Sequence, residues 1–468
     1  MAASMLVMIL TAWSSREIVL SIVFYYSDPQ VKLYHKNFYR PENLCVIVAG
    51  SVSPKEVLKA LEPFEKKIIA KGQRKSFTRP WQKPVPPITG PLELTVPYPC
   101  DDDDHGLVYV AFRGPSLKAC EDIAALLVMQ DYLTDTSVSP LQKLFVETED
   151  PYCSMVKASF IENKESCFYF GFENVTKGKL RMIKSTLIKA LSDIANGATP
   201  LDMERMAVVI QRRRLRILNQ VESAPHESIA NTVIMDFLYG DTLEDLRNRV
   251  NQIPIFVGLL KKDKQFWVNL LKKHMVDNKA ISVIGEPSPH LLGKMSDAES
   301  QRIQRQRETL GDDGLQKRAE ALEKAIEANE AEPPKDMILA VEVPPVSTIS
   351  FHSLLRACNA HGDKGIMSFG LQGIPFRFEL DHIKTNFVSL TVMLNTSGIS
   401  QDLRMHIPLF LELLHESPVI TKTGRLNHND VINQLEADTI HIVTGLGLEC
   451  SARFFAGSHA QYASLCLL

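Results

Sequence analysis

Two segments of the chain repeat one phrase at a distance that only a whole domain can fill. The first, NLCVIVAGSVSP, occupies residues 43–54, and the second, NKAISVIGEPSP, occupies residues 278–289. They share Asn, Val, Gly, Ser and Pro at matching positions without a gap, and the offset is 278 − 43 = 235 residues. Solenoid repeats are about 20 to 50 residues long, so this offset indicates two homologous domains rather than a repeat array.

Each phrase predicts the same local order of elements. Residues 31–39 have helical spacing, and 44–49 form a continuous apolar run that predicts a strand buried on both faces. Ser53 and Pro54 then predict the start of a helix that ends near residue 70. The second phrase follows a predicted helix at 263–275 and contains a predicted strand at 280–284. The order helix, Asn, strand, Gly, Ser-Pro therefore occurs twice.

The region between the phrases predicts one complete domain of mixed helices and strands. Residues 72–91 are rich in proline, with basic residues between, and predict an extended linker. Strands are expected at 107–112, 152–160 and 167–174, the last two as an antiparallel pair. Helices are expected at 118–133, 139–147, 178–196, 200–222 and 226–239.

The part after the second phrase changes in character. Residues 296–332 are dense in Glu, Lys, Arg, Gln and Ala and are interrupted once by Gly-Asp-Asp-Gly at 311–314. This pattern predicts two polar helices joined by a tight turn and lying between domains. Beyond them, strands are expected at 370–380, 386–393 and 441–444, a helix at 405–414, and a helix or strand start at 430–438.

Composition sets the broad class. A chain of 468 residues is long enough for about three domains, and its net charge of −3 argues for neither a nucleic acid nor a membrane as partner. The eight cysteines are scattered without a Cys-x-x-Cys pair, which favours small buried thiols in a reducing compartment over a disulfide framework. We therefore expect a cytoplasmic protein, with the mitochondrial matrix as the alternative.

The first residues are apolar but do not form a recognisable targeting signal. Residues 1–13 lack the basic start of a signal peptide, and the apolar pattern resumes only at 18–26. Neither piece reaches the roughly 18 residues that span a bilayer. We expect a buried helix or a non-native start, rather than a membrane anchor.

Four stretches resemble one known family. YHKNFYRPENLCVIVAGSVSPKEVLKALEPFEKKI resembles the end of the catalytic domain in the pitrilysin/insulinase family of zinc metallopeptidases. CDDDDHGLVYVAFRGP and YLTDTSVSPLQKLFVETEDPYC resemble the second domain of its presequence-protease-like branch, in which one chain holds all domains. ETLGDDGLQKRAEALEKAIEANE resembles the helical hinge between the two halves. The resemblance extends from about residue 30 to 455 and rests on scaffold motifs.

The resemblance implies an α/β (α+β) fold of repeated metallopeptidase-type modules, each a mostly antiparallel sheet with helices packed on one face. It also implies a chain cut at both ends, as in an incomplete gene model or a splice product. The expected segments are an atypical N-terminal piece (1–29), a remnant of the catalytic-type domain (30–75), a proline-rich linker (76–91), a second homologous domain (92–290), a charged helical hinge (291–334) and a truncated third domain (335–468).

The chemistry of that family requires His-x-x-Glu-His on a helix, where two histidines hold zinc and the glutamate acts as base. No two of the thirteen histidines here lie four residues apart, so neither this motif nor its inverse occurs in the sequence. The resemblance therefore transfers no catalytic residue and no metal ligand, and substrate-binding residues stay unknown. We expect no cofactor in this chain, although the full-length family uses zinc.

Other candidate residues have ordinary explanations. Four adjacent carboxylates at Asp101–Asp104, with His105, cannot all converge on one cation, so a solvated entry to a strand is favoured. His226-Glu227 and His415-Glu416 lack a second ligand at helical spacing and are expected to be ordinary helix residues. Arg212–Arg214 could form a phosphate or nuclear-targeting patch, but the surrounding apolar pattern favours a solvated helix face. Asn174-Val175-Thr176 fits a glycosylation acceptor, yet nothing else supports secretion.

Three functions remain open from the sequence. The first is a fragment of a zinc metalloendopeptidase-like protein whose full-length parent degrades peptides, the fragment itself being inactive. The second is a non-catalytic family member that acts as a scaffold or binding subunit. The third, an unrelated α/β interaction protein, is the least favoured. Unfolded peptides are the expected partners in the first two, because the family holds extended substrates at a sheet edge.

Overall fold

The structure is a computed structural model. It describes residues 28–50, 52–72, 79–90, 92–339, 345–349, 353–359, 373–422, 424–447 and 461–468, together with the single residues 77, 343 and 351. The chain divides into two compact units, one formed by 1–289 and 389–468 and the other by 290–388. The expectations for residues 1–27 and for the strand start at 370–372 lie outside the described residues.

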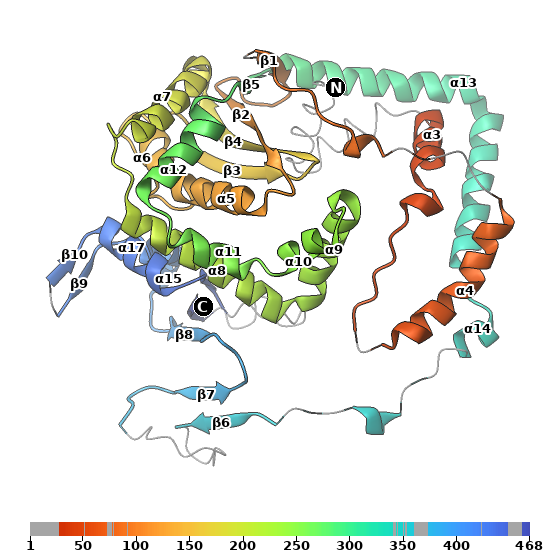
Figure 1. Cartoon of the computed structure of the whole chain (residues 1–468). Helices are drawn as coiled ribbons and strands as arrows, with labels where there is room; N and C mark the ends of the chain where they lie inside the picture. Colours follow the sequence, from red (N-terminus) through yellow and green to blue (C-terminus); the bar gives the residue numbers. More distant parts are fainter. Residues whose placement is uncertain are drawn as a thin grey trace. The chain divides into compact units, whose positions relative to one another are not determined.

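A five-stranded sheet is the centre of the first unit (Figure 1). Its strands are β1 (Leu92–Tyr98), β2 (His105–Ser116), β3 (Met155–Ile161), β4 (Glu165–Thr176) and β5 (Ala280–Pro287), in the spatial order β1-β5-β2-β4-β3. Only the β1–β5 pair is parallel, and the other three pairs are antiparallel. The prediction of a mostly antiparallel sheet is thus confirmed.

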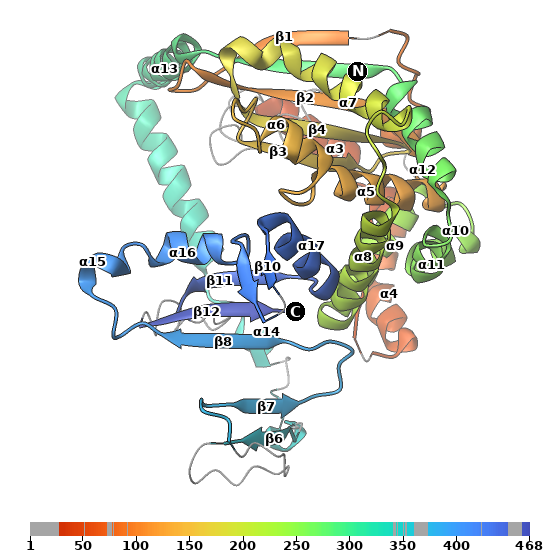
Figure 2. The ribbon, with the colours of Figure 1, turned by 90° about the vertical axis from the view of Figure 1, so that its left-hand side faces the viewer.

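Several helices pack on one face of this sheet and enclose the main core, and the others continue the chain from these (Figure 2). Their bounds are α5 (Cys120–Thr134), α6 (Pro140–Phe145), α7 (Ile183–Ala195), α8 (Met203–Ser223), α9 (Pro225–Tyr239), α10 (Leu243–Val250), α11 (Ile253–Leu259) and α12 (Lys264–Leu271). A 3-10 helix, Lys177–Met182, precedes α7, and a π-helix, Lys272–Val276, follows α12. Phe112 of β2, Phe170 of β4 and Trp267 of α12 are fully buried in this core.

The second copy of the repeated phrase forms the strand β5 with a neighbour on each edge. Val283 pairs with Leu94 on one side and with Tyr109 on the other. Asn278, the first residue of the phrase, donates from Nδ2 to the carbonyl oxygens of His274 and Arg113. This bond ties the end of the preceding helix to the sheet, which explains why the phrase begins with Asn.

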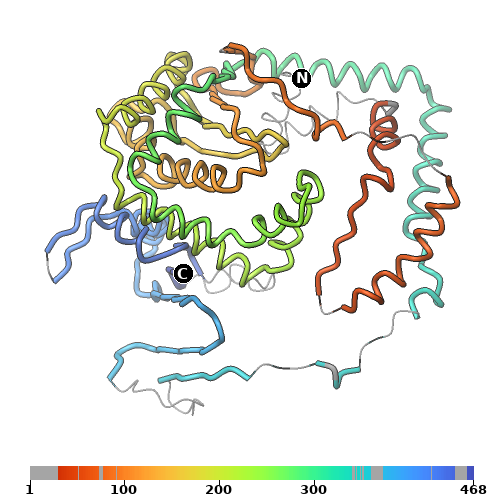
Figure 3. Tube along the Cα trace, in the orientation of Figure 1, coloured from red at the N-terminus to blue at the C-terminus, as the bar shows by residue number. Residues whose placement is uncertain are grey.

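The first copy of the phrase has the same flanking helices as the second (Figure 3). Its described residues lack the paired strand between them. Helix α3 (Asp28–Phe38) precedes it, and Asn43 Nδ2 donates to the carbonyl of Phe38, as Asn278 does for its own helix. Pro54 begins the helix α4 (Pro54–Ala70) at the position where Pro289 begins α13. Gly50 has φ of +143°, a conformation that favours glycine.

The predicted buried strand at 44–49 is wrong in this structure. The segment is extended, has no pairing strand among the described residues, and leaves Leu44, Val46 and Val48 about half exposed. A strand needs a neighbour to satisfy its backbone groups, and the apolar pattern alone cannot supply one. The helices α3 and α4 likewise bury no residue whose exposure is described.

The linker after α4 contains a 3-10 turn, Pro80–Gln82, and its other described residues are irregular. It is attached to α9 at two points. The Arg79 guanidinium lies 4.4 Å from the Phe237 ring centroid, and Gln82 Nε2 donates to the carbonyl of Leu238 at 2.5 Å. A cation–π contact and a side-chain hydrogen bond therefore fix a segment that the sequence predicted only as extended.

The C-terminal part of the first unit contains a three-stranded antiparallel sheet in the order β11-β12-β8. Helices α16 and α17 lie on one face of it (Figure 2). The bounds are β8 (Leu390–Asn395), α15 (Gln401–Arg404), α16 (Ile407–Leu414), α17 (His428–Asp438), β11 (Ile442–Leu446) and β12 (Tyr462–Leu467), with the hairpin β9 (Val419–Thr421) and β10 (Gly424–Leu426) before α17. The region predicted as helix or strand at 430–438 is a helix.

The second unit begins with one long element, α13 (Pro289–Glu330), whose regular geometry is broken at Gly311 with φ of +58°. This break confirms the prediction of two polar helices interrupted at 311–314. A short helix, α14 (Lys335–Leu339), follows, then a 3-10 turn (Val346–Thr348) and the antiparallel pair β6 (Leu355–Cys358) and β7 (Glu379–His382). Among the helices described in either unit, none has the length and apolar character that a membrane span needs.

Limited proteolysis should distinguish the two copies of the phrase. We expect early cleavage within 28–71, because its helices bury nothing and its apolar stretch is unpaired, while 92–287 resists because its strands and helices share one core. Mass spectrometry of the early fragments provides the measurement. Cleavage within 92–287 before any loss of 28–71 would contradict this account.

Candidate functional site

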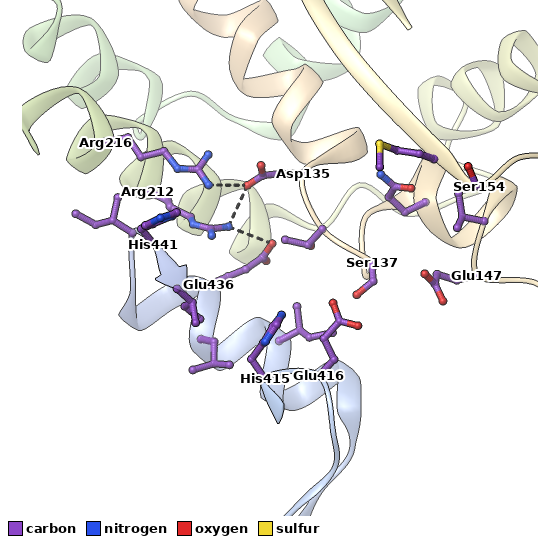
Figure 4. A pocket seen from close by; sticks show the side chains of 18 residues that line it. Asp135, Ser137, Glu147, Ser154, Arg212, Arg216, His415, Glu416, Glu436 and His441 are labelled. Carbon is purple, nitrogen blue, oxygen red and sulfur yellow. Dashed lines mark hydrogen bonds and ion pairs between the residues drawn. The ribbon is translucent and has the colours of Figure 1, made fainter. Parts of the chain in front are cut away.

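The candidate site is a cavity of about 630 Å³ between α8, the loop from α5 to α6, and the C-terminal helices of the same unit (Figure 4). Its walls carry both signs of charge and two histidines. The polar lining residues labelled in Figure 4 are Asp135, Ser137, Glu147, Ser154, Arg212, Arg216, His415, Glu416, Glu436 and His441.

One face of α8 provides the basic side chains. Arg205, Arg212 and Arg216 are spaced by seven and four residues, and this spacing places them along the same side of a helix. The helix begins at a strong cap, because the Asp202 side chain accepts hydrogen bonds from the backbone N–H groups of Glu204 and Arg205.

Asp135, at the C-terminal end of α5, binds two of these arginines. Its Oδ2 accepts from Arg212 at 3.0 Å and from Arg216 at 3.2 Å. One turn earlier on α5, Asp131 accepts from Arg213 at 2.5 Å. These two carboxylates therefore attach α8 to α5 through charge-assisted hydrogen bonds.

Glu436 of α17 approaches the same arginines from the C-terminal part of the chain. Its side chain is 4% exposed and lies 3.6 Å from both Arg205 and Arg212. Neither carboxylate oxygen of Glu436 has a hydrogen-bond donor in the described structure. The attraction is thus electrostatic, and it joins α17 to α8 through side chains that are only 4% to 15% exposed.

Arg205 is fixed by α5 as well as by this charge. It donates to the carbonyl of Tyr132 at 2.7 Å and to Ser139 Oγ at 2.9 Å, and its guanidinium lies 5.0 Å from the Tyr132 ring centroid. The neighbouring Arg212 is buried, and burial together with the nearby Arg216 lowers its pKa. Burial raises the pKa of Asp131 against the opposing effect of Arg213.

The prediction that Arg212–Arg214 form a solvated helix face is wrong. Arg212 and Arg213 are only 15% and 24% exposed and pair with Asp135 and Asp131. The apolar residues of α8 correctly indicated its buried side. The arginines lie at the edge of that side and pair with carboxylates of α5. A phosphate or nuclear-targeting patch has no support, since these charges are already compensated inside the fold.

His415 and Glu416 follow the end of α16 and line the cavity, whereas the sequence predicted ordinary helix residues. His226 and Glu227 do lie in a helix, in the exposed first turn of α9. Neither residue lines the cavity.

The acidic run before β2 is exposed, as the sequence predicted. His105 Nδ1 lies 2.6 Å from Asp102 Oδ2, and Asp103 pairs with Lys177 at 2.9 Å. A hydrogen bond from the backbone N–H of Asp104, together with His105, lowers the pKa of Asp102. The carboxylates thus point to different partners. Asn174, the glycosylation candidate, is exposed, has φ of +51° and donates to Ser154 Oγ.

The seven cysteines in the described part of the chain are free thiols. Two of them, Cys153 and Cys167, are buried, and burial raises their pKa to about 12 and about 11. A thiol in that range stays protonated near neutral pH and is a poor nucleophile. These two positions agree with the prediction of small buried residues, whereas the other five described cysteines are only partly buried.

The described residues do not fit a zinc ion. None of them form a group of three or more His, Cys, Asp or Glu side chains placed to hold a metal. His415, His441, Glu416 and Glu436 line one cavity, but Figure 4 shows His441 and Glu436 apart from the neighbouring His415 and Glu416. Structural and catalytic zinc sites need three or four converging ligands.

Sequence reasoning missed Glu436, Asp135 and Asp131 as members of the site. The spacing of Asp131 and Asp135, four residues apart on α5, could have suggested partners for the arginines at 212 and 216. Nothing in the sequence indicates that α17 meets α8, because that contact joins positions more than 200 residues apart.

Comparison with known proteins identifies the class. Residues 27–207 match the family model described as the peptidase M16 inactive domain. An uncharacterized protein of Caenorhabditis elegans is 30% identical over 421 residues, which are 88% of this chain and 41% of that protein. An uncharacterized protein of Schizosaccharomyces pombe is 27% identical over 445 residues, 92% of this chain and 42% of that protein. A protease from Helicobacter pylori is a structural match with a TM-score of 0.44 and 19% identity, covering 56% of this chain and 60% of the other.

The chain therefore carries an inactive domain of the M16 type. This match is consistent with the resemblance to the pitrilysin/insulinase family that the scaffold motifs indicated. That family is zinc-dependent in general. The chain spans about two fifths of the length of the curated relatives that it matches.

Proposed function

We propose that this chain is the non-catalytic part of a zinc metallopeptidase-like protein and that it holds extended peptides without cleaving them. The observation that carries the proposal is the match of residues 27–207 to the M16 inactive domain, in a sequence that contains no His-x-x-Glu-His. The cavity beside α8 supports it, because a volume of about 630 Å³ is in the range of binding sites for small ligands and peptide side chains.

The parent protein would degrade peptides if its longer sequence contains the missing motif. The alternative, a scaffold or binding subunit without any catalytic partner domain, makes the same prediction for this chain. An in-frame His-x-x-Glu-His in the genomic sequence upstream of Met1 separates the two, since only a catalytic parent requires it. Free thiols among the described cysteines support a reducing compartment, and we propose the cytoplasm, with the mitochondrial matrix as the alternative.

Zinc content tests the metal part of the proposal. After dialysis against zinc-free buffer, the purified chain should retain far less than one zinc per molecule, because no converging ligand set exists among its described residues. Inductively coupled plasma mass spectrometry gives the stoichiometry. A His415→Ala/His441→Ala variant is the control and should show the same low content. Stoichiometric zinc in the unmodified chain, lost in this variant, would assign a metal site to the cavity and overturn the proposal.

A further inference from the structure

The cavity beside α8 adjoins a second one of about 550 Å³. Ser137, Glu147 and Glu416 line both, so the two cavities meet at these three side chains. Figure 4 shows Ser137 between the two glutamates, of which Glu147 follows α6 in the chain and Glu416 follows α16. Two carboxylates from segments about 270 residues apart thus border one continuous recess.

Buried atoms without a hydrogen-bond partner gather around this recess. They are Glu436 Oε1 and Oε2, His415 Nδ1, Asn429 Oδ1, Ser137 Oγ and Arg212 Nε. Carboxylate and amide oxygens can only accept, and a histidine nitrogen or a hydroxyl can do so as well. Glu436 is the strongest sign, because it is 4% exposed and both of its oxygens lack a donor. The walls therefore lack donors more than acceptors.

The charges of the recess show the same imbalance. Arg212 and Arg216 line it but both donate to Asp135, and Arg212 also faces Glu436. Within the described part of the chain, Glu147 and Glu416 form no ion pair, although Lys143 lines the second cavity with them. Both glutamates are exposed, so their carboxylates are available to a cation from outside.

The geometry points to a site for the guanidinium group of an arginine side chain in a bound polypeptide. A guanidinium is planar, permanently charged and carries five N–H donors, so it can bridge two carboxylates and also supply the donors that the walls lack. An ammonium offers only three donors from a single point and fits two separated carboxylates less well. This inference rests on the proposed peptide-binding function and names the side chain that the cavity selects.

The test measures binding of short blocked peptides to the full chain by isothermal titration calorimetry. The probes are a Gly/Ser peptide with one central arginine, the same peptide with lysine or with neutral citrulline, and free arginine. We expect the arginine peptide to bind about tenfold more tightly than the citrulline peptide, and free arginine more weakly than the arginine peptide. A Glu147→Gln/Glu416→Gln variant should lose that tenfold preference.

Matched controls keep the result interpretable. Glu149→Gln and Glu412→Gln change exposed glutamates that do not line either cavity and should leave the preference intact. Circular dichroism melts should show that every variant folds. Equal binding of the arginine and citrulline peptides, a preference that persists in the double variant, or absence of peptide binding would each overturn the inference. Equal binding of all peptides would leave the proposed function standing, whereas cleavage of the peptides would refute that function.

Discussion

Replacing Glu436 by alanine is expected to lower the free energy of unfolding by about 3–5 kcal/mol, the typical cost of removing one partner of a buried ion pair. The carboxylate is 4% exposed and lies 3.6 Å from both Arg205 and Arg212, which are themselves only 11% and 15% exposed. Without it, α17 loses its electrostatic attachment to α8, and two buried guanidinium groups keep a charge that one carboxylate had compensated.

Urea unfolding followed by circular dichroism measures this effect. Glu412→Ala is the control, since that glutamate lies exposed on α16 and forms no ion pair with any described residue; its change should stay within about 0.5 kcal/mol. Glu436→Gln separates charge from shape, and we expect it to be nearly as destabilising as alanine. If Glu436→Ala changes the free energy of unfolding no more than the control does, α17 does not depend on this contact.

Most helices and strands around the five-stranded sheet were predicted, because each has a local sequence signal. The alternation of β4 and the apolar run of β2 predicted two strands that the structure places side by side. Capping residues located helix starts equally well, as at Ser139 before α6 and at Pro54 in α4. Such signals lie within a few residues of one another, so a single sequence is sufficient to recognise them.

Strand pairing was harder to predict. β1 was missed, because this seven-residue strand includes Pro97 and its partner among the described residues, β5, lies almost 190 residues away. Residues 44–49 show the opposite error. Their apolar pattern is stronger than that of β5, yet they form no strand, because no strand among the described residues pairs with them. Local pattern indicates the capacity to form a strand, and the neighbouring strand decides the outcome.

The candidate site could not be predicted from the sequence either, because its residues come from distant parts of the chain. Arginines at 212 and 213 are indistinguishable in sequence from a solvated helix face until Asp131, Asp135 and Glu436 are placed beside them. The absence of His-x-x-Glu-His, by contrast, could be read directly from thirteen histidine positions. The sequence thus shows that this motif is absent from the chain, and only the fold indicated where a ligand could bind.

The most direct test of the account is a turnover measurement with a quenched fluorescent peptide, made on a homogeneous preparation with and without added zinc. Enzymes accelerate such reactions by about a millionfold or more, so the presence or absence of a working site is unambiguous. We predict the background rate in both conditions, because hydrolysis needs a metal to activate water and a base to take its proton, and the sequence lacks the motif that supplies them. Turnover that a chelator abolishes would contradict the central claim.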